Sequence, residues 1–309
     1  MTVRKLNMAK KRSRLPDWFR TRLPTGELLE KFTETKNTVT ENTLHTVCQE
    51  ARCPNIHECW AAKDATFMVA GQECTRGCKF CAVGTIKRPP PLDEKEPANL
   101  AEAISTMGLN HAVITVVNRD DLEDSGAMHY RRCLEAVREK SPEVTLELLC
   151  SDLAGDHEDL AILLENLELE VFAHNVECVP RLDLKVRDRR ATFEQSIGIL
   201  VEAKRLRPDI LTKSSLMVGL GETDEEVTEA LQMLRDANVD LVTIGQYLAP
   251  SPKHLAVDRF PEPSQYDEWS IQIEEMGFLG WACGPLVRSS YKAGELLAKA
   301  TTSLRTNME

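Results

Sequence analysis

The chain has 309 residues, of which 42% are hydrophobic and 28% are charged, a composition typical of a soluble globular protein. Its formal net charge of −11 argues against bulk electrostatic binding of nucleic acid or anionic membranes, and its apolar runs are too short for a membrane helix. Ten cysteines in a chain of this length do not indicate a disulfide-rich secreted fold. Six of them fall between Cys48 and Cys81, and such clustering indicates metal binding.

The first 22 residues form a basic arm, with eight lysines and arginines against the single carboxylate of Asp17. Because the rest of the chain is acidic, the arm is expected either to dock an acidic partner or to be a solvated tail. A transit peptide is not expected, since the arm is short and poor in serine and lacks the apolar core of a secretory signal.

From residue 66 onward, short apolar runs alternate with helical patterns. Pro97 opens one expected helix and Gly108 ends it, an apolar stripe at 193–201 predicts a second, and Thr223 with Glu226 predicts a capping box for a third. The expected strands are 67–70, 112–117, 144–149, 171–176, 216–220 and 241–248. Six βα units in a row predict a parallel α/β sheet. Periodicity does not separate an open sheet from a curved partial barrel, but both place their site at the carboxyl ends of the strands.

The second cysteine group is a CxxxCxxC motif, formed by Cys74, Cys78 and Cys81, directly after the first expected strand. Three thiolates at this spacing can hold a cubic iron–sulfur cluster, and no fourth local cysteine is present, so one iron stays open for another ligand. Zinc is the rival metal, although a structural zinc site needs four ligands. We therefore predict a site-differentiated [4Fe–4S] cluster here.

This motif resembles the signature of the radical S-adenosylmethionine (SAM) superfamily, in which an aromatic residue, here Phe80, precedes the last cysteine. The resemblance implies that SAM chelates the open iron through its amine and carboxylate. It also implies that an electron from the cluster cleaves SAM to a 5′-deoxyadenosyl radical. Such a cofactor suits hydrogen removal from unactivated carbon, which lies beyond the reach of side-chain acids and bases.

The first cysteine group, Cys48, Cys53 and Cys59, has a CxxxxCxxxxxC spacing that fits neither a zinc finger nor a ferredoxin run. It too lacks one ligand of four. Segment 53–60 is similar to the N-terminal motif of lipoyl synthases, which holds an auxiliary [4Fe–4S] cluster. His57, inside the motif, is an alternative ligand, although its position between two cysteines favours a surface location.

The resemblance to lipoyl synthases continues through five later segments in the same order, at 117–122, 171–177, 212–223, 244–248 and 284–291. The last contains an Arg-Ser-Ser-Tyr motif, and carrying the family pattern over by position makes Ser290 the fourth ligand of the auxiliary cluster. Two departures concern loop geometry: 149–152 replaces a strand end that usually contains proline, and Ser215 stands where glycine is common.

Membership of this family implies a radical SAM sulfurtransferase. It would insert two sulfur atoms, at C6 and C8, into protein-bound octanoyl-lysine to form lipoyl-lysine, with the auxiliary cluster as sulfur donor. The implied cofactors are two [4Fe–4S] clusters and SAM. The implied partners are octanoylated lipoyl-carrier proteins, namely 2-oxoacid dehydrogenase acyltransferase subunits and the glycine-cleavage carrier protein. An electron donor such as ferredoxin or flavodoxin and a cluster-delivery protein complete the set. Oxygen-sensitive clusters favour a reducing compartment, and a cytoplasmic location is predicted.

Two residues are predicted to be catalytic. A serine oxygen is a harder ligand than a thiolate and a poorer match for iron in a sulfide cluster, so Ser290 is expected to hold the iron lost when sulfide is released. Arg288 is expected to contact the substrate or to brace the auxiliary site. Polar residues and glycines at strand ends are candidates for holding SAM beside Phe80: Asn118, Asn175, Gly219, Gly221 and Gln246. Asn118 could equally cap the next helix, and the two glycines could equally form a plain strand-to-helix turn.

The four remaining cysteines, Cys133, Cys150, Cys178 and Cys283, are predicted to be buried or half-buried thiols outside both groups. The fold is expected to be a partial (β/α)6 barrel of the radical SAM type, with N- and C-terminal extensions that carry an auxiliary cluster. Residues 1–65 would hold the basic arm and auxiliary-cluster motif, 66–263 the barrel, and 264–309 a C-terminal helical segment with the Arg-Ser-Ser-Tyr motif. The alternatives are another sulfur-inserting radical enzyme of the biotin synthase kind, a non-catalytic iron–sulfur carrier or a zinc-binding adaptor.

Overall fold

The computed structural model describes residues 15–20, 24–41, 46–50 and 53–308. Most of the basic arm and the first residues of the chain lie outside this part, so nothing structural bears on the two interpretations of that arm. Among the described residues, none of the helices is long and apolar enough to span a bilayer.

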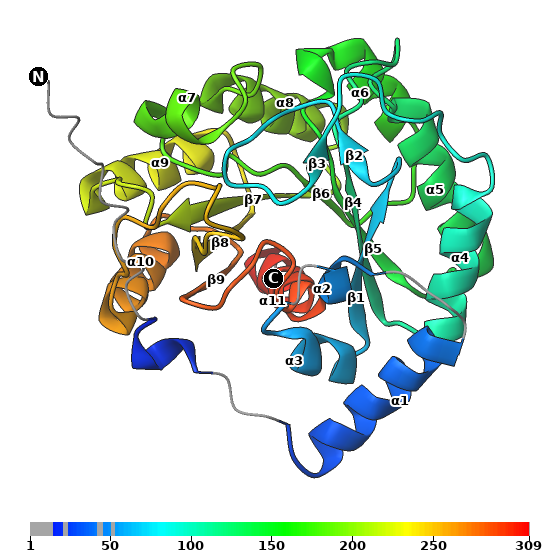
Figure 1. Cartoon of the computed structure of the whole chain (residues 1–309), viewed down its shortest axis with the longest axis horizontal. Helices are drawn as coiled ribbons and strands as arrows, with labels where there is room; N and C mark the ends of the chain where they lie inside the picture. Colours follow the sequence, from blue (N-terminus) through cyan, green and yellow to red (C-terminus); the bar gives the residue numbers. More distant parts are fainter. Residues whose placement is uncertain (1–14, 21–23, 42–45, 51–52, 309) are drawn as a thin grey trace, which may run out of the picture.

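Seven parallel strands form one sheet, and each strand pairs with the next one along the chain. Figure 1 shows these strands as an incomplete ring with helices around the outside. The strands are β1 (Asp64–Val69), β4 (His111–Val116), β5 (Thr145–Leu149), β6 (Val171–Ala173), β7 (Leu211–Val218), β8 (Leu241–Gln246) and β9 (Gly280–Gly284). The curved partial barrel is therefore the architecture, with its two edges at β1 and β9.

Amphipathic helices cover the outer face of the sheet, as expected for parallel strands joined by right-handed crossovers. They are α4 (Glu96–Met107), α5 (Ala127–Lys140), α6 (His157–Leu164), α8 (Phe193–Leu206), α9 (Asp224–Asp236) and α10 (Pro263–Glu275). Their ends follow the sequence signals. Gly108 ends α4 in the left-handed region at φ 56°, and Thr223 and Glu226 form the capping box of α9.

The remaining elements lie at the edges and ends of the barrel. The N-terminal helices are α1 (Glu27–Glu41), α2 (Val47–Glu50) and α3 (Ile56–Ala61), and a two-stranded pair, β2 (Glu73–Cys74) and β3 (Gly84–Thr85), follows β1. A short helix, α7 (Asp183–Val186), follows β6, and three single 3-10 turns lie at 17–19, 153–155 and 180–182.

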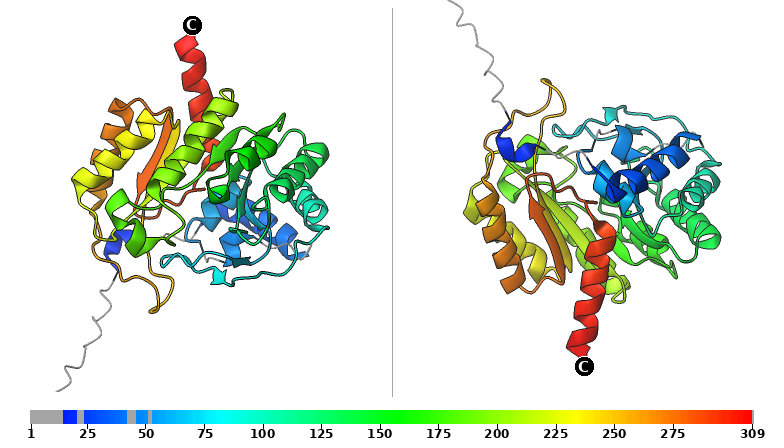
Figure 2. Two further views of the ribbon diagram at one scale, coloured as in Figure 1. Left: turned by 90° about the horizontal axis from the view of Figure 1, so that it is seen from above. Right: turned by 90° about the horizontal axis from the view of Figure 1, so that it is seen from below.

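The C-terminal helix α11 (Ala293–Met308) closes the amino end of the barrel. Its Leu296 and Leu297 pack with Val171 and Leu211, the first residues of β6 and β7. Both views of Figure 2 show α11 protruding on the side away from the cyan loop that carries β2 and β3. The opposite, carboxyl end of the strands is therefore the one left for a site.

Two strands differ from the sequence-based expectation. β7 begins at Leu211 rather than at 216. The pattern of apolar residues does not predict the added positions, because Thr212 to Ser215 are polar although they are buried. β9 was not expected at all, and it lies in the segment predicted to be helical, so the sheet has one strand more than the six predicted. With two glycines and a half-buried centre, β9 lacks the apolar run by which the other strands are found.

Candidate active site

The Cys74–Cys81 loop lies at the carboxyl end of β1, where the sequence places it. Backbone amides point at two of its sulfurs: the Arg76 N–H donates to Cys74 Sγ at 3.4 Å, and the Asp188 N–H donates to Cys78 Sγ at 3.3 Å. Burial raises the pKa of the Cys78 thiol to about 11, and a bound cation favours the thiolate form that ligates a metal. Amide donors at sulfur are a feature of iron–sulfur sites, and the loop fits such a cluster.

A buried cation fixes the same loop. The Arg76 guanidinium donates to Asp120 at 2.7 Å and to Asp152 at 2.6 Å, and all but 2% of its side chain is buried. Burial alone would raise the pKa of the Asp152 carboxyl, but Arg76 outweighs that effect and keeps the pKa below its usual value. Asp152 belongs to the segment in which the sequence departs from the family pattern, so here that departure still supplies a partner for the cluster loop.

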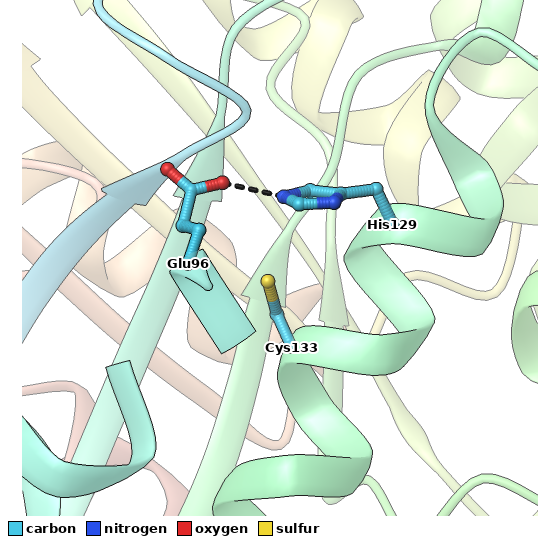
Figure 3. A group of neighbouring side chains, drawn as sticks. All are labelled: Glu96, His129 and Cys133. Atoms are coloured by element: carbon cyan, nitrogen blue, oxygen red, sulfur yellow. Dashed lines mark hydrogen bonds and ion pairs between the residues drawn. The ribbon is translucent and has the colours of Figure 1, made fainter. Parts of the chain in front are cut away.

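A second group of side chains lies at the start of the loop, and Figure 3 shows its members, Glu96, His129 and Cys133. Glu96 accepts the backbone N–H of Ala70 at 2.8 Å, and it lies 2.5 Å from His129 Nε2. Ala70 is the turn residue between β1 and the cluster loop and has φ 68°. Because one oxygen of Glu96 already serves both the amide and the imidazole, we assign this group to holding the turn rather than to a metal.

The first cysteine group and the Arg-Ser-Ser-Tyr segment meet at the open edge of the barrel. Cys48, Cys53 and Cys59 line one cavity together with Ser290, although more than 200 residues separate them in the chain. Burial raises the pKa values of these three thiols, and that of Cys59 reaches about 12. Two buried thiols, Cys48 and Cys59, the half-buried thiol of Cys53 and a hydroxyl around one cavity are a suitable donor set for a cluster.

Three side-chain hydrogen bonds join the two ends of the chain around this cavity. Asn55 Nδ2 donates to the Leu286 carbonyl at 2.6 Å, and Tyr291 Oη donates to Glu58 at 2.7 Å. Thr66, on β1, donates to Ser290 Oγ at 3.0 Å. His57 is half-buried and is not among the described residues that line this cavity; its ring packs edge-on against Phe32 of α1, with the ring centroids 4.3 Å apart.

A second cavity lies at the carboxyl ends of β6, β7, β8 and β9. Of the residues predicted to hold SAM, it brings together Phe80, Asn175 and Gln246. Arg288 lines both this cavity and the first one, so a single side chain borders the two candidate sites. The guanidinium donates to the Val287 carbonyl at 2.7 Å, and burial lowers its pKa.

The other predicted SAM residues lie around this cavity without lining it. Gly219 has φ 92°, and a Cβ there would lie 2.0 Å from the buried Gln246 amide nitrogen, so this glycine makes room for Gln246. Gly221, at φ 110°, forms the turn into α9. Asn118 meets the cluster loop through its carbonyl, which accepts the N–H of Thr75 at 3.0 Å.

Glu177 is a site residue that the sequence-based list omitted. It lines the second cavity, adopts φ 65° and accepts a hydrogen bond from Asn175 at 3.2 Å. Its presence in segment 171–177 was the available signal, because a carboxylate at a strand end can hold a polar ligand. Of the four other cysteines, Cys133, Cys150 and Cys178 are buried as predicted, and Cys283 is half-buried on β9.

Comparison with protein families gives two matches. The Radical SAM superfamily matches residues 68–234, and the N-terminal domain of lipoyl synthase of the Radical SAM family matches residues 2–53. The first of these covers the cluster loop and most of the barrel. The second covers the basic arm, α1 and α2.

Known sequences extend the similarity over nearly the whole chain. A mitochondrial lipoyl synthase of Arthroderma otae is 50% identical over 288 residues, which are 92% of this chain and 69% of that protein. The mitochondrial lipoyl synthase of Bos taurus is 47% identical over 300 residues, covering 95% of this chain and 79% of that protein. These relatives are described as mitochondrial, so the prediction of a cytoplasmic location is wrong.

Solved structures share the fold at low sequence identity. The FeFe-hydrogenase maturase HydG from Carboxydothermus hydrogenoformans matches with a TM-score of 0.56 at 13% identity, over 89% of this chain and 75% of that one. Methylornithine synthase matches with a TM-score of 0.54 at 14% identity, over 81% of this chain and 76% of that one. These matches agree with the predicted radical SAM barrel.

Proposed function

The chain belongs to the lipoyl synthase family of radical SAM enzymes, and on that premise we propose how its residues divide the reaction. It is an enzyme that inserts sulfur into protein-bound octanoyl-lysine, at C6 and C8, to form lipoyl-lysine. A [4Fe–4S] cluster and SAM are cofactors of its superfamily. The assignment of individual residues to cofactors, the second cluster and the individual partners are proposals.

Cys74, Cys78 and Cys81 hold the radical SAM cluster in this proposal. The observation in favour is the pair of backbone amides aimed at Cys74 and Cys78, together with the fixed position of the loop between Arg76 and Ala70. When bound, the cluster and SAM supply the 5′-deoxyadenosyl radical that removes hydrogen from an unactivated carbon. The chain's own contribution is to keep the three thiols together and to leave the remaining iron position without a protein ligand.

SAM is proposed to occupy the second cavity. Phe80 offers an aromatic wall, while the Asn175 and Glu177 side chains offer polar groups at the end of β6. The side-chain amide of Gln246 is engaged with the carbonyls of Val218 and Arg259, so it shapes the wall through its packing. Asn118, Gly219 and Gly221 act at the rim through their backbone.

Cys48, Cys53, Cys59 and Ser290 are proposed to hold the auxiliary cluster, which supplies the inserted sulfur when it is bound. The observation that carries this proposal is their convergence on one cavity from opposite ends of the chain. The donor set is unusual for structural zinc, which favours cysteine and histidine ligands throughout. His57 faces Phe32 rather than supplying such a ligand.

Arg288 is proposed to orient the substrate between the two sites. It borders both cavities, and its guanidinium has further donors than the one used by Val287. An acyl chain attached to a lysine amide presents one strong acceptor, the amide carbonyl, to such a donor. Binding there would fix the amide end of the chain, from which C6 and C8 lie five and seven bonds away.

The partners are proposed to be the octanoylated lipoyl-carrier proteins, both the acyltransferase subunits of 2-oxoacid dehydrogenases and the glycine-cleavage carrier protein. A ferredoxin or flavodoxin would deliver electrons, and a delivery protein would rebuild the spent cluster. Each follows from the reaction, which consumes electrons and, in this proposal, a sulfide-bearing cluster.

Anaerobic metal analysis and one turnover assay test the proposal. Two cubane clusters require about eight irons per chain, and Cys48→Ala with Cys53→Ala and Cys59→Ala should leave about four. With SAM, dithionite and an octanoyl-lysine peptide, the native enzyme should form both 5′-deoxyadenosine and sulfurated peptide. The triple variant should still form 5′-deoxyadenosine but no sulfurated peptide. Sulfurated peptide from the triple variant would contradict the role of the auxiliary cluster.

A further inference from the structure

The surface around the cluster loop, at the carboxyl ends of the strands, is rich in cations although the chain as a whole is acidic. The whole chain carries −11, but segment 73–88 has four cationic side chains against the single carboxylate Glu73. Segment 181–190 has five cationic side chains against Asp183 and Asp188. A local excess of cations on an acidic protein attracts negatively charged partners, whereas the rest of the surface repels them.

Hydrogen bonds join these segments into one surface around the loop. The Lys79 N–H donates to the Val186 carbonyl at 2.8 Å, and Lys79 Nζ reaches the Leu184 carbonyl at 3.3 Å. On the other side, His254 Nε2 lies 2.9 Å from the Cys81 carbonyl, which brings segment 251–255 to the same rim. In Figure 1 the cyan loop with β2 and β3 and the green helix α7 lie on this rim.

Six exposed cations on this rim, which we call the mouth cations, have no carboxylate partner among the described residues. They are Lys79, Lys87, Arg88, Lys185, Arg189 and Lys253. Two carboxylates beside the loop, Asp120 and Asp188, are already paired with Arg76 and Arg190. The positive charge of the mouth cations is therefore left for something outside the chain.

Two exposed apolar side chains stand among the mouth cations. Leu184, on α7, is 75% exposed, the highest value among the large hydrophobic residues in the described part of the chain, and Ile86 is 40% exposed. Apolar anchors within a rim of charge are the usual composition of a protein–protein interface, in which charge steers the encounter and apolar contacts hold the complex.

We propose that the mouth cations, with Leu184 and Ile86, are the docking surface for an acidic carrier domain that presents its octanoyl-lysine to the cavity behind them. This proposal rests on the proposed function, because it assumes that the substrate is carried by a protein. The domain must place a lysine arm between the two cavities that Arg288 borders, and the mouth cations lie beside the second of them, since Lys79 directly precedes Phe80 of its lining. Charge complementarity requires carboxylates around the modified lysine of the partner.

The test compares two substrates at the same active site, an octanoylated carrier domain and a short uncharged octanoyl-lysine peptide, with dithionite as reductant. The test variants are Lys87→Glu/Arg88→Glu/Arg189→Glu and, separately, Leu184→Ser. The control is Lys36→Glu/Arg132→Glu, which reverses two exposed cations on the outer helices α1 and α5 that have no carboxylate partner among the described residues; the double variant Lys87→Glu/Arg88→Glu is its match in charge. Dithionite removes any dependence on an electron-donor protein.

The triple variant should raise KM for the carrier about tenfold or more and leave kcat unchanged, while KM for the peptide changes less than twofold. Leu184→Ser should raise KM for the carrier severalfold, and added salt should weaken carrier use by the native enzyme more than by the triple variant. An unchanged KM for the carrier, or an equal loss with carrier and peptide, would overturn the docking surface. A second series with ferredoxin or flavodoxin in place of dithionite completes the test, and a defect that appears only in that series would assign the surface to the electron donor and overturn the proposal. Failure of the native enzyme to sulfurate either substrate would instead reject the proposed function.

Discussion

Ser290 differs from the three cysteines of its cavity in how easily its side chain ionises and in how well it suits iron. A hydroxyl is a harder ligand than a thiolate, and its oxygen also accepts the hydrogen bond of Thr66 at 3.0 Å. The iron at this position is therefore expected to be the most weakly held of the auxiliary cluster. Weak binding of the iron at Ser290 would allow the cluster to release sulfide while the three cysteine ligands remain bound.

Ser290→Cys should therefore bind the cluster more firmly and slow sulfur insertion, by about tenfold for a gain of about 1.4 kcal/mol in iron affinity. The measurements are iron retention against a chelator and the yield of sulfurated peptide. Thr66→Val is the comparison variant: it removes the hydrogen bonds of the Thr66 hydroxyl to Ser290 and to Cys48 but keeps all four ligand side chains. Full sulfur insertion by Ser290→Cys with an unchanged cluster lifetime would contradict the argument.

At the scale of elements, the link between β1 and the cluster loop depends on Ala70. Its N–H is held by Glu96, and its carbonyl accepts a hydrogen bond from Arg119 at 3.2 Å. Left-handed backbone at a residue with a Cβ costs about 1 kcal/mol or more, so these contacts must hold the turn. Helices α4 and α5 thus set where the cluster loop begins.

Glu96→Leu should release this turn and destabilise the protein by about 1–3 kcal/mol, because the buried Ala70 amide loses its acceptor. Hydrogen exchange in segment 70–74 should accelerate more than exchange in β5 or α8, and urea unfolding gives the overall loss. Ala70→Gly is the partner variant, since it removes the strain and should offset part of the loss in the Glu96 background. Equal acceleration throughout the barrel would count against a local role.

The strand β7 contains a charge that the sequence pattern does not explain. Lys213 Nζ lies 2.9 and 2.8 Å from the two oxygens of Glu147 on β5, and each side chain is 1% exposed. Burial raises the pKa of Glu147, and Lys213 opposes that rise. His111, on β4, lies 4.0 Å from the same carboxylate.

Lys213→Met should cost about 3–5 kcal/mol, because it leaves the Glu147 carboxylate buried without its partner. Adding Glu147→Leu should recover most of the loss, since replacing both members of a buried pair is nearly neutral when the packing is kept. Urea unfolding of the single and double variants measures both values. A double variant that is as unstable as Lys213→Met would show that the barrel interior needs the ion pair itself.

The sequence pattern predicts the elements whose buried side chains are apolar and does not predict those whose buried side chains are polar. Segment 212–215 of β7 was left out because its side chains are buried through partners on other strands, such as Glu147 for Lys213 and Thr243 for Ser215. β9 was missed because its place is set by its neighbour β8 and by α11. The candidate ligand residues are predicted from motifs. Glu177 and Thr66 are not, because their roles depend on which strands lie next to one another in the folded chain.

For the whole molecule, the auxiliary site closes the gap between the two edges of the barrel. Residues near position 50 on one side and near 290 on the other meet there through Asn55, Tyr291 and Thr66. A cluster bound to Cys48, Cys53, Cys59 and Ser290 would add a crosslink around a loop of more than 200 residues. Such a crosslink removes far more freedom from the unfolded chain than one within a single loop.

Removing the auxiliary iron should therefore lower thermal stability more than removing the radical SAM iron. Cys48→Ala/Cys53→Ala/Cys59→Ala and Cys74→Ala/Cys78→Ala/Cys81→Ala are matched, because each set deletes three thiols and about four irons. The cysteines replaced in the second set span only eight residues, from Cys74 to Cys81. With a difference of about 2 kcal/mol or more from loop closure, the Tm values should separate by about 3 °C or more in a chain of 309 residues. Hydrogen exchange should rise in α3, β9 and segment 286–292 of the first variant and stay unchanged in α5 and α8. Equal losses of Tm would mean that the edges of the barrel are held by protein contacts alone.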